Sequence, residues 1–226
     1  MAQRWELLRE RIEQAARRAG RDPREIRIVA VSKTVGAGPI SEAAAAGATR
    51  FGESRAAELA AKAEELADLA LDWHFVGHLQ TNKVRIVAPW CRLIHSLDRL
   101  PLARRIDERA PEGGSQAVLV QVSTSGKAAQ SGVAPDQLPA LLDALVELPR
   151  LRVEGLMTIG PLTEDRGAVR AAFRLLREAA RREREVRRPR QPLAELSMGM
   201  SGDYELAVEE GATLLRIGTA LFGRRD

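Results

Sequence analysis

The sequence predicts a (β/α)8 TIM barrel, an eight-stranded parallel barrel within a ring of helices, with an extra N-terminal helix. Short β-rich runs alternate with longer amphipathic stretches along the chain, and eight strand candidates can be counted. Strands joined by helical crossovers form parallel sheets, and 226 residues lie within the size range of a closed barrel. An open doubly wound sheet is the alternative. Its three-glycine fingerprint is absent, because VSKTVGAG offers only Gly36 and Gly38 after the first strand.

The periodicity places each element in turn, beginning with a helix at 3–19. Strands are expected at 27–32, 49–52, 72–77, 92–97, 117–122, 152–157, 193–198 and 214–219. Helical segments are expected at 39–46, 54–68, 99–110, 135–147, 166–185 and 203–210. Pro39 and Pro135 stand where first helical turns would begin, and Gly47 and Gly211 where helices would end.

Composition indicates a single globular domain over residues 1–226, without a linker. The chain is 45% hydrophobic and 29% charged, and its single cysteine, Cys91, excludes a disulfide framework. There is no apolar run of the ~20 residues that a membrane span needs and no apolar signal core at the start. A cytoplasmic protein is expected.

Positive charge is concentrated in one stretch. Eight arginines and three glutamates lie between Arg174 and Arg190, which gives +5 against a whole-chain charge of +4. The mixed signs and the apolar stripe Phe173, Leu176 and Ala180 favour a solvated outer helix running into a loop; an anionic partner is the alternative. Few aromatic residues accompany these arginines, so nucleic acid is not expected as a partner.

The ends of the predicted strands carry the candidate chemistry, because barrel active sites form there. Lys33 follows the first strand and is one of four lysines beside 31 arginines. An amine can form a Schiff base with a carbonyl and a guanidinium cannot. The alternative is a rim lysine paired with Glu53 or Glu58.

The last two strand ends resemble a phosphate site. SMGMSGD and RIGTALFG place Ser201, Gly218 and Thr219 at helix N-termini, whose free N–H groups bind phosphate. Capped tight turns are the alternative. Strand alternation puts Leu214, Arg216 and Gly218 on one face. If Gly218 faces the phosphate, Arg216 points into the barrel mouth, where it needs a carboxylate or a ligand acceptor such as a ring nitrogen.

The histidines and methionines are weaker signals. His74 and His78 lie too far apart on a strand to share a metal, at roughly 13 Å. His78 could contact a ligand beside Gly77, whereas His95 and Cys91 are interpreted as core residues. Met157, Met198 and Met200 all fall at strand ends, where core packing or packing against a flat ring would suit them.

Seven segments together resemble the pyridoxal phosphate homeostasis proteins, whose barrel is similar to the N-terminal domain of alanine racemase. They are VAVSKT, RFGES, WHFVGHLQTNK, VSTSGKAAQSG, LRVEGLMTIGP, LSMGMSGD and LLRIGTALFG, in chain order. The resemblance implies pyridoxal 5'-phosphate as cofactor, with an imine on Lys33, Arg216 facing the pyridine nitrogen, and the phosphate near Ser201, Gly218 and Thr219. The cofactor-binding residues expected on this basis are Lys33, Ser54, His78, Met157, Ser197, Met198, Gly199, Ser201, Arg216, Gly218 and Thr219.

The chain departs from the family pattern at three places. Ser54 stands where the family usually has Asn, Val35 and Gly36 where Pro often follows the Lys-Thr pair, and Gln130 where Lys is frequent. The side-chain contact of residue 54 with the cofactor is therefore expected to be weaker or lost, and a handover role for a second lysine, such as Lys127, does not follow from the resemblance.

The resemblance implies a monomeric, non-catalytic carrier that takes part in vitamin B6 homeostasis and delivers cofactor to recipient apoenzymes. The alternative is an amino-acid racemase. The barrel is expected to use the whole chain, which leaves no second domain to supply a tyrosine base, and Tyr204 is the only tyrosine. An arginine against the ring nitrogen would also weaken the electron sink that racemisation needs.

Overall fold

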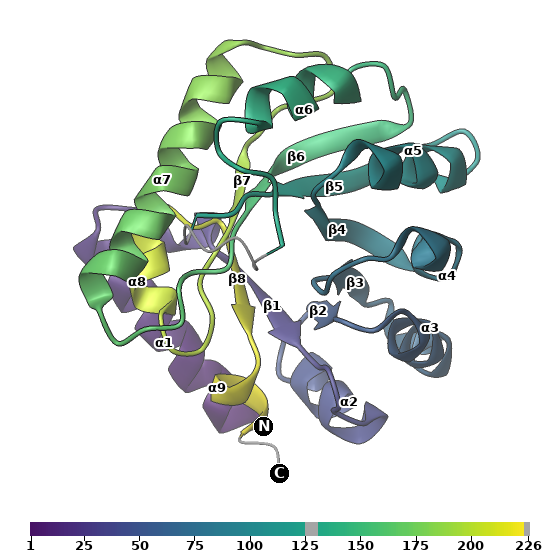
Figure 1. The fold of residues 1–226 in the computed structure, drawn as a ribbon. Coiled ribbons are helices and arrows are strands. Elements are labelled where there is room, and N and C mark those ends of the chain that lie inside the picture. The colour runs from purple at the N-terminus through teal and green to yellow at the C-terminus, as the bar shows by residue number, and fades with distance from the viewer. Residues whose placement is uncertain (125–130, 224–226) are drawn as a thin grey trace.

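A computed structural model describes residues 1–124 and 131–223 and contains a closed parallel barrel. Eight strands pair in chain order and β8 returns to β1 (Figure 1). They are β1 (Arg27–Val31), β2 (Arg50–Glu53), β3 (Asp72–Phe75), β4 (Cys91–Leu97), β5 (Gln116–Gln121), β6 (Leu151–Met157), β7 (Glu195–Ser197) and β8 (Leu214–Ile217). The predicted fold class is confirmed.

Helices cover the outside of this barrel. They are α1 (Ala2–Arg18), α2 (Ala37–Ala45), α3 (Ala56–Glu65), α4 (Val84–Val87), α5 (Leu100–Arg109), α6 (Leu138–Leu145), α7 (Arg166–Glu185), α8 (Tyr204–Glu209) and α9 (Thr219–Phe222). Short 3-10 turns lie at Pro23–Glu25, Ala67–Leu69 and Thr81–Lys83. The extra helix α1 packs against α2, α8 and α9, beside the seam where β8 meets β1 (Figure 1). No helix in the described ranges is long and apolar enough to cross a bilayer.

Several predicted boundaries need correction, each for a local reason. Leu193 has φ of 49°, a left-handed conformation that cannot continue a strand, so β7 begins at Glu195 and not at 193. Strand β8 stops at Ile217 because Gly218 is the N-cap of α9. Helix α6 starts at Leu138, three residues after Pro135. The predicted stops are confirmed: Gly47 and Gly211 follow their helices with positive φ.

The interior of the barrel is layered. An apolar layer of Val29, Leu93, Leu119, Met157 and Leu214 fills its middle. The second, larger apolar core lies between the barrel and its helices. This apolar layer lies between the mouth, where the strands end, and the floor, where they begin.

Close contact of two strands depends on Gly155 in β6. A Cβ atom at this position would lie 1.9 Å from the carbonyl oxygen of Glu195 in β7. Only glycine permits that approach, so the closure of the barrel between β6 and β7 depends on it.

Candidate functional site

One cavity at the barrel mouth unites most of the predicted site residues. It has a volume of about 370 Å3, within the ~300–1,000 Å3 range of small-molecule sites. Its lining comes from the ends of six strands and the loops that follow them: Val31, Lys33, Ser54, Val76, Ile159, Met200, Ser201, Gly202, Arg216, Gly218 and Thr219. Lys33, Ser54, Ser201, Arg216, Gly218 and Thr219 are therefore brought together from positions up to 186 residues apart.

A turn held by two hydrogen bonds places Lys33 in the lining of this cavity. The turn is closed by a hydrogen bond from the Val35 N–H to the Ser32 carbonyl at 2.8 Å. Thr34 has φ of 61°, which is strained for a β-branched residue, and its N–H donates to Glu58 Oε1 at 2.6 Å. The Lys33 side chain itself is exposed.

Lys62 stabilises this turn through three hydrogen bonds. Its Nζ donates to the Ser32 carbonyl, Glu53 Oε1 and Glu58 Oε1, each at 2.7 Å, and its side chain is 9% exposed. The alternative in which Lys33 pairs with Glu53 or Glu58 is therefore wrong, because both carboxylates bind Lys62. Lys33 has no ion-pair partner within residues 1–124 and 131–223.

Burial dominates the electrostatics behind the turn. It raises the pKa of Glu53, although hydrogen bonds from Lys62 and Ser32 oppose the rise. Burial also acts to raise the pKa of Glu58, but hydrogen bonds from Lys62 and the Thr34 N–H outweigh it and the net pKa is lowered. Lys62 therefore has a structural role, and among the lysines that the structure describes Lys33 is the one that lines the cavity.

Arg216 enters the mouth from β8, as its strand position predicts. Its Nη1 donates to Ser197 Oγ at 2.7 Å and its Nη2 to the Thr158 carbonyl at 2.8 Å. Burial lowers its pKa to about 10 while nearby Asp203 opposes that change, so the guanidinium remains charged at neutral pH. Two of its five N–H donors are used in these contacts, which leaves donors for a ligand acceptor in the cavity.

A buried hydrogen-bond chain supports Arg216 from below. Ser197 Oγ lies 2.9 Å from His95 Nδ1, and His95 Nε2 lies 2.8 Å from His74 Nδ1. Burial lowers the pKa of His74 to about 3, with nearby arginines adding to the effect, and it also lowers the pKa of His95 well below its ordinary value. Both histidines are therefore neutral at physiological pH. Their contact was not predicted, because it joins strands 21 residues apart whose register is irregular.

The two glycine-rich loops form a cradle of free N–H groups that would suit an anion. The backbone N–H groups of Ser201, Gly202, Gly218 and Thr219 have no hydrogen-bond partner in the part of the chain that the structure describes. All four residues line the cavity, and Thr219 begins α9, whose positive dipole end faces an anion favourably. Ser201 Oγ accepts from the Ala220 N–H at 3.1 Å, which ties the two loops together. Unlike the expectation for Ser201, α8 begins only at Tyr204.

The remaining predicted residues lie around this cavity without lining it. His78 lines a neighbouring cavity that shares only Ser54 with the first, and its Nδ1 lies 3.9 Å from Asp98. Met157 belongs to the apolar layer inside the barrel, and Met198 to the core outside it. Gly199 has φ of 91° and its carbonyl accepts from the Arg216 N–H. Lys127 and Gln130 lie outside the described residues.

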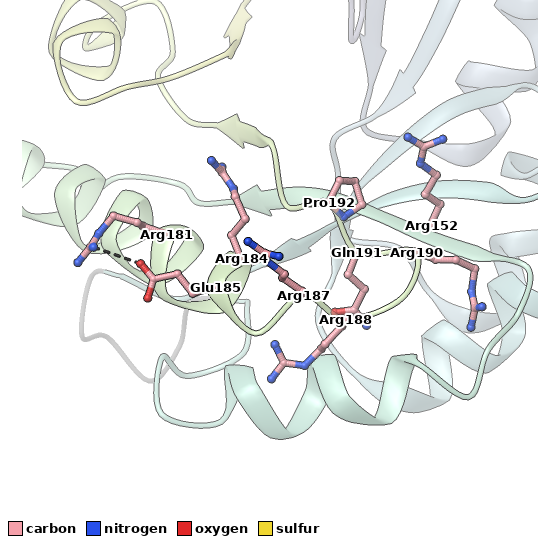
Figure 2. Close-up of a pocket in the computed structure, with 9 residues that line it drawn as sticks. All are labelled: Arg152, Arg181, Arg184, Glu185, Arg187, Arg188, Arg190, Gln191 and Pro192. Carbon is pink, nitrogen blue, oxygen red and sulfur yellow. Dashed lines mark hydrogen bonds and ion pairs between the residues drawn. The ribbon is translucent and has the colours of Figure 1, made fainter.

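The Arg-rich segment forms a larger hollow elsewhere, of about 830 Å3. Figure 2 shows its arginine side chains fanning out instead of converging. Most are committed to structural contacts: Arg184 and Arg190 donate to backbone carbonyls, and Arg188 to Asp143 and Glu183. Phe173, Leu176 and Ala180 are buried, so the interpretation as an outer helix with a solvated face is confirmed.

The fold and the mouth define a barrel of the racemase class, and residues 5–226 match the family model "Alanine racemase, N-terminal domain". A Pseudomonas aeruginosa protein named pyridoxal phosphate homeostasis protein is 49% identical over 217 residues, covering 96% of this chain and 92% of that protein. The crystal structure of Synechococcus elongatus PipY with PLP bound is 41% identical with a TM-score of 0.82, covering 94% of this chain and 100% of PipY. The chain belongs to the pyridoxal phosphate homeostasis protein family.

Alanine racemases share only the fold. The Clostridium difficile enzyme has a TM-score of 0.74 at 16% identity, and the match covers 99% of this chain but 56% of the enzyme.

Proposed function

We propose that this protein binds pyridoxal 5'-phosphate at the barrel mouth and holds it in reserve without catalysing turnover. The amine of Lys33 condenses with the cofactor aldehyde, with loss of water, to give a covalent imine. We further propose that the chain acts as a single-domain monomer in the cytoplasm and passes the cofactor to apoenzymes.

One observation carries the proposal: an exposed lysine, a buried charged arginine and four unpartnered N–H groups line the same cavity. Each group matches one part of the cofactor. The amine suits the aldehyde, the cradle suits the phosphate, and Arg216 suits the lone pair of the ring nitrogen. The cofactor supplies an electrophilic aldehyde and a conjugated ring that absorbs visible light.

Two features favour a carrier over a racemase. The charge of Arg216 disfavours protonation of the ring nitrogen and so weakens the ring as an electron sink. Tyr204 is packed in the core between barrel and helices and does not line the cavity. Racemisation needs acid–base groups on both faces of the substrate α-carbon, and the described lining offers Lys33 on one side only.

The test combines cofactor release with proton exchange. The purified protein is incubated with L-alanine, L-serine and L-glutamate in heavy water, and the α-proton is followed by NMR. Exchange far below about 1 s⁻¹, the low end of ordinary enzymes, together with transfer of cofactor to an added apoenzyme, is the expected result.

Exchange at or above that rate would overturn the carrier function and favour the racemase. A protein that does neither would be a binding protein without a delivery role. A colourless protein that takes up no added cofactor would contradict the binding itself.

A further inference from the structure

A second cavity lies at the floor of the barrel, where all eight strands begin. Its volume is about 490 Å3. Its charged lining residues are Arg27, Arg50, Asp72, Arg92, Arg152, Glu154 and Glu195, and the buried His74 also faces it.

Two floor arginines lack carboxylate partners. Arg27 pairs with Glu195, and Arg152 Nε lies 2.7 Å from Glu154. Among the described residues Arg92 has no ion pair or side-chain hydrogen bond, and Arg50 has only a long hydrogen bond of 3.4 Å to Thr49 Oγ1. The Arg-rich hollow near α7 differs, because most of its guanidinium groups are already anchored.

The floor is also electropositive around His74. Burial is the largest cause of the lowered pKa of this histidine, and the charges of Arg50, Arg27 and Arg92 lower it further. Three guanidinium groups from three different strands therefore act on one buried ring. An anion placed among them would relieve their mutual repulsion.

The hydrogen-bond chain from Arg216 assigns the tautomer of His74, that is, which ring nitrogen carries its proton. Arg216 must donate to Ser197 Oγ, so the single Ser197 proton is free to go to His95 Nδ1. His95 then carries its proton on Nε2 and donates to His74 Nδ1. His74 in turn carries its proton on Nε2, which has no partner in residues 1–124 and 131–223. This assignment gives every donor and acceptor between Arg216 and His74 Nδ1 a partner, as buried polar groups require, and leaves the His74 Nε2–H for the floor cavity.

We propose that the barrel floor is a second anion site that binds a phosphate group between Arg50, Arg92 and the Nε2–H of His74. Guanidinium groups match phosphate oxygens in geometry as well as in charge. Asp72 shares the cavity without an ion-pair partner in the described chain, and its carboxylate can accept the proton that hydrogenphosphate retains.

The site is connected to the mouth. A phosphate that accepts from His74 polarises each hydrogen bond of the chain in the same sense, so Ser197 becomes a stronger acceptor for Arg216. Occupancy of the floor thus tightens the arginine that faces the mouth cavity. The site itself does not depend on the proposed cofactor function.

The chain has three histidines, so each ring can be followed separately by NMR. The apo-protein is labelled with 15N-histidine and titrated with inorganic phosphate at constant ionic strength, with sodium chloride as the balancing salt. The expected result is a saturable shift of His74 Nε2, a smaller shift of His95 with the same midpoint, and no matching shift of the exposed His78.

A paired variant locates the ligand. R50Q/R92Q should raise the phosphate Kd by about a hundredfold or more, because each of the two lost charge-assisted hydrogen bonds accounts for about tenfold or more. R11Q/R104Q removes two exposed positive charges elsewhere and should leave the Kd unchanged. R92Q alone serves if the double variant does not fold.

A His74 resonance that does not respond, or that responds equally in R50Q/R92Q, would overturn the floor site. A shift of His95 without His74 would place the phosphate at the mouth and also overturn it. Because no cofactor is added, failure here leaves the proposed cofactor function untouched, and the converse also holds.

Discussion

Arg216 illustrates what residue-level reasoning from the sequence can and cannot predict. Alternation along its strand, together with a phosphate site at Gly218, predicted that it points into the barrel mouth. Its partners were not predictable, because Ser197 and the Thr158 carbonyl come from other strands and neither is a carboxylate. A charged group held by neutral acceptors keeps its charge available for a ligand.

The buried histidines make stability depend on pH. A histidine whose pKa is lower in the folded state binds fewer protons than it does in the unfolded chain, so stability is lost as pH falls from about 6.5 towards the folded pKa, about 3 for His74. Between about pH 6.5 and pH 4.5, the free energy of unfolding of the wild type should therefore fall by about 2 kcal/mol more than that of His74→Gln. Urea denaturation at both pH values measures this. His78→Gln is the control, since His78 is exposed, and it should match the wild type.

The cradle hydroxyls should contribute to cofactor retention. Ser201→Ala and Thr219→Ala each remove a donor to a charged acceptor, which is equivalent to roughly 1.5–3 kcal/mol of binding free energy. Equilibrium dialysis of the cofactor should show weaker retention in each variant and the weakest in the double variant, with unchanged circular dichroism. Full retention in the double variant would place the phosphate elsewhere.

At the scale of the element, the turn Ser32–Val35 and helix α3 act together. The sequence places Lys33, Glu53 and Glu58 after the first two strands, but it does not indicate which lysine the carboxylates bind. Helix α3 determines which lysine these carboxylates bind, because it places Lys62 one helical turn after Glu58 and within ion-pair distance of Glu53. Lys33 is thereby left for the cavity.

Lys62→Met should destabilise the fold by about 3–5 kcal/mol, because it leaves the buried Glu53 without its cation. Glu53→Gln/Lys62→Met should recover much of that loss, since no buried charge remains. Chemical denaturation measures both, and Lys83→Met, which removes an exposed lysine, is the control. A Lys62→Met protein as stable as Lys83→Met would contradict the role of Lys62.

At the scale of the whole molecule, the alternation of strand and helix patterns, the chain length and the missing glycine fingerprint predicted the barrel and its extra helix. Boundaries were less predictable, because left-handed residues such as Leu193 and capping residues such as Gly218 depend on how neighbouring elements approach. The floor cavity was not predicted at all. It exists only once the starts of all eight strands, most of which carry a charged or polar group, meet in a ring.

Barrel closure offers a test at this scale. Gly155→Ala should destabilise the protein by about 3 kcal/mol or more, because the new methyl would collide with the Glu195 backbone. Gly38→Ala is the matched control, since no atom lies within 4 Å of its Cβ position and it should stabilise α2 by roughly 0.5–1 kcal/mol. Thermal unfolding of the two variants should therefore shift in opposite directions. Equal effects would contradict the close contact of β6 and β7.

The most direct test of the account is covalent trapping of the cofactor. Borohydride reduction of the cofactor-loaded protein, followed by peptide mass spectrometry, should find the adduct on Lys33, which is the one lysine lining the mouth cavity within residues 1–124 and 131–223. Lys62 should be unmodified because it is enclosed by Glu53, Glu58 and the Ser32 carbonyl, and Lys83 because it lines a different cavity. Lys33→Ala should abolish this adduct while phosphate contacts retain some cofactor. An adduct chiefly on any other lysine of the wild-type protein would contradict the assignment of the mouth as the cofactor site.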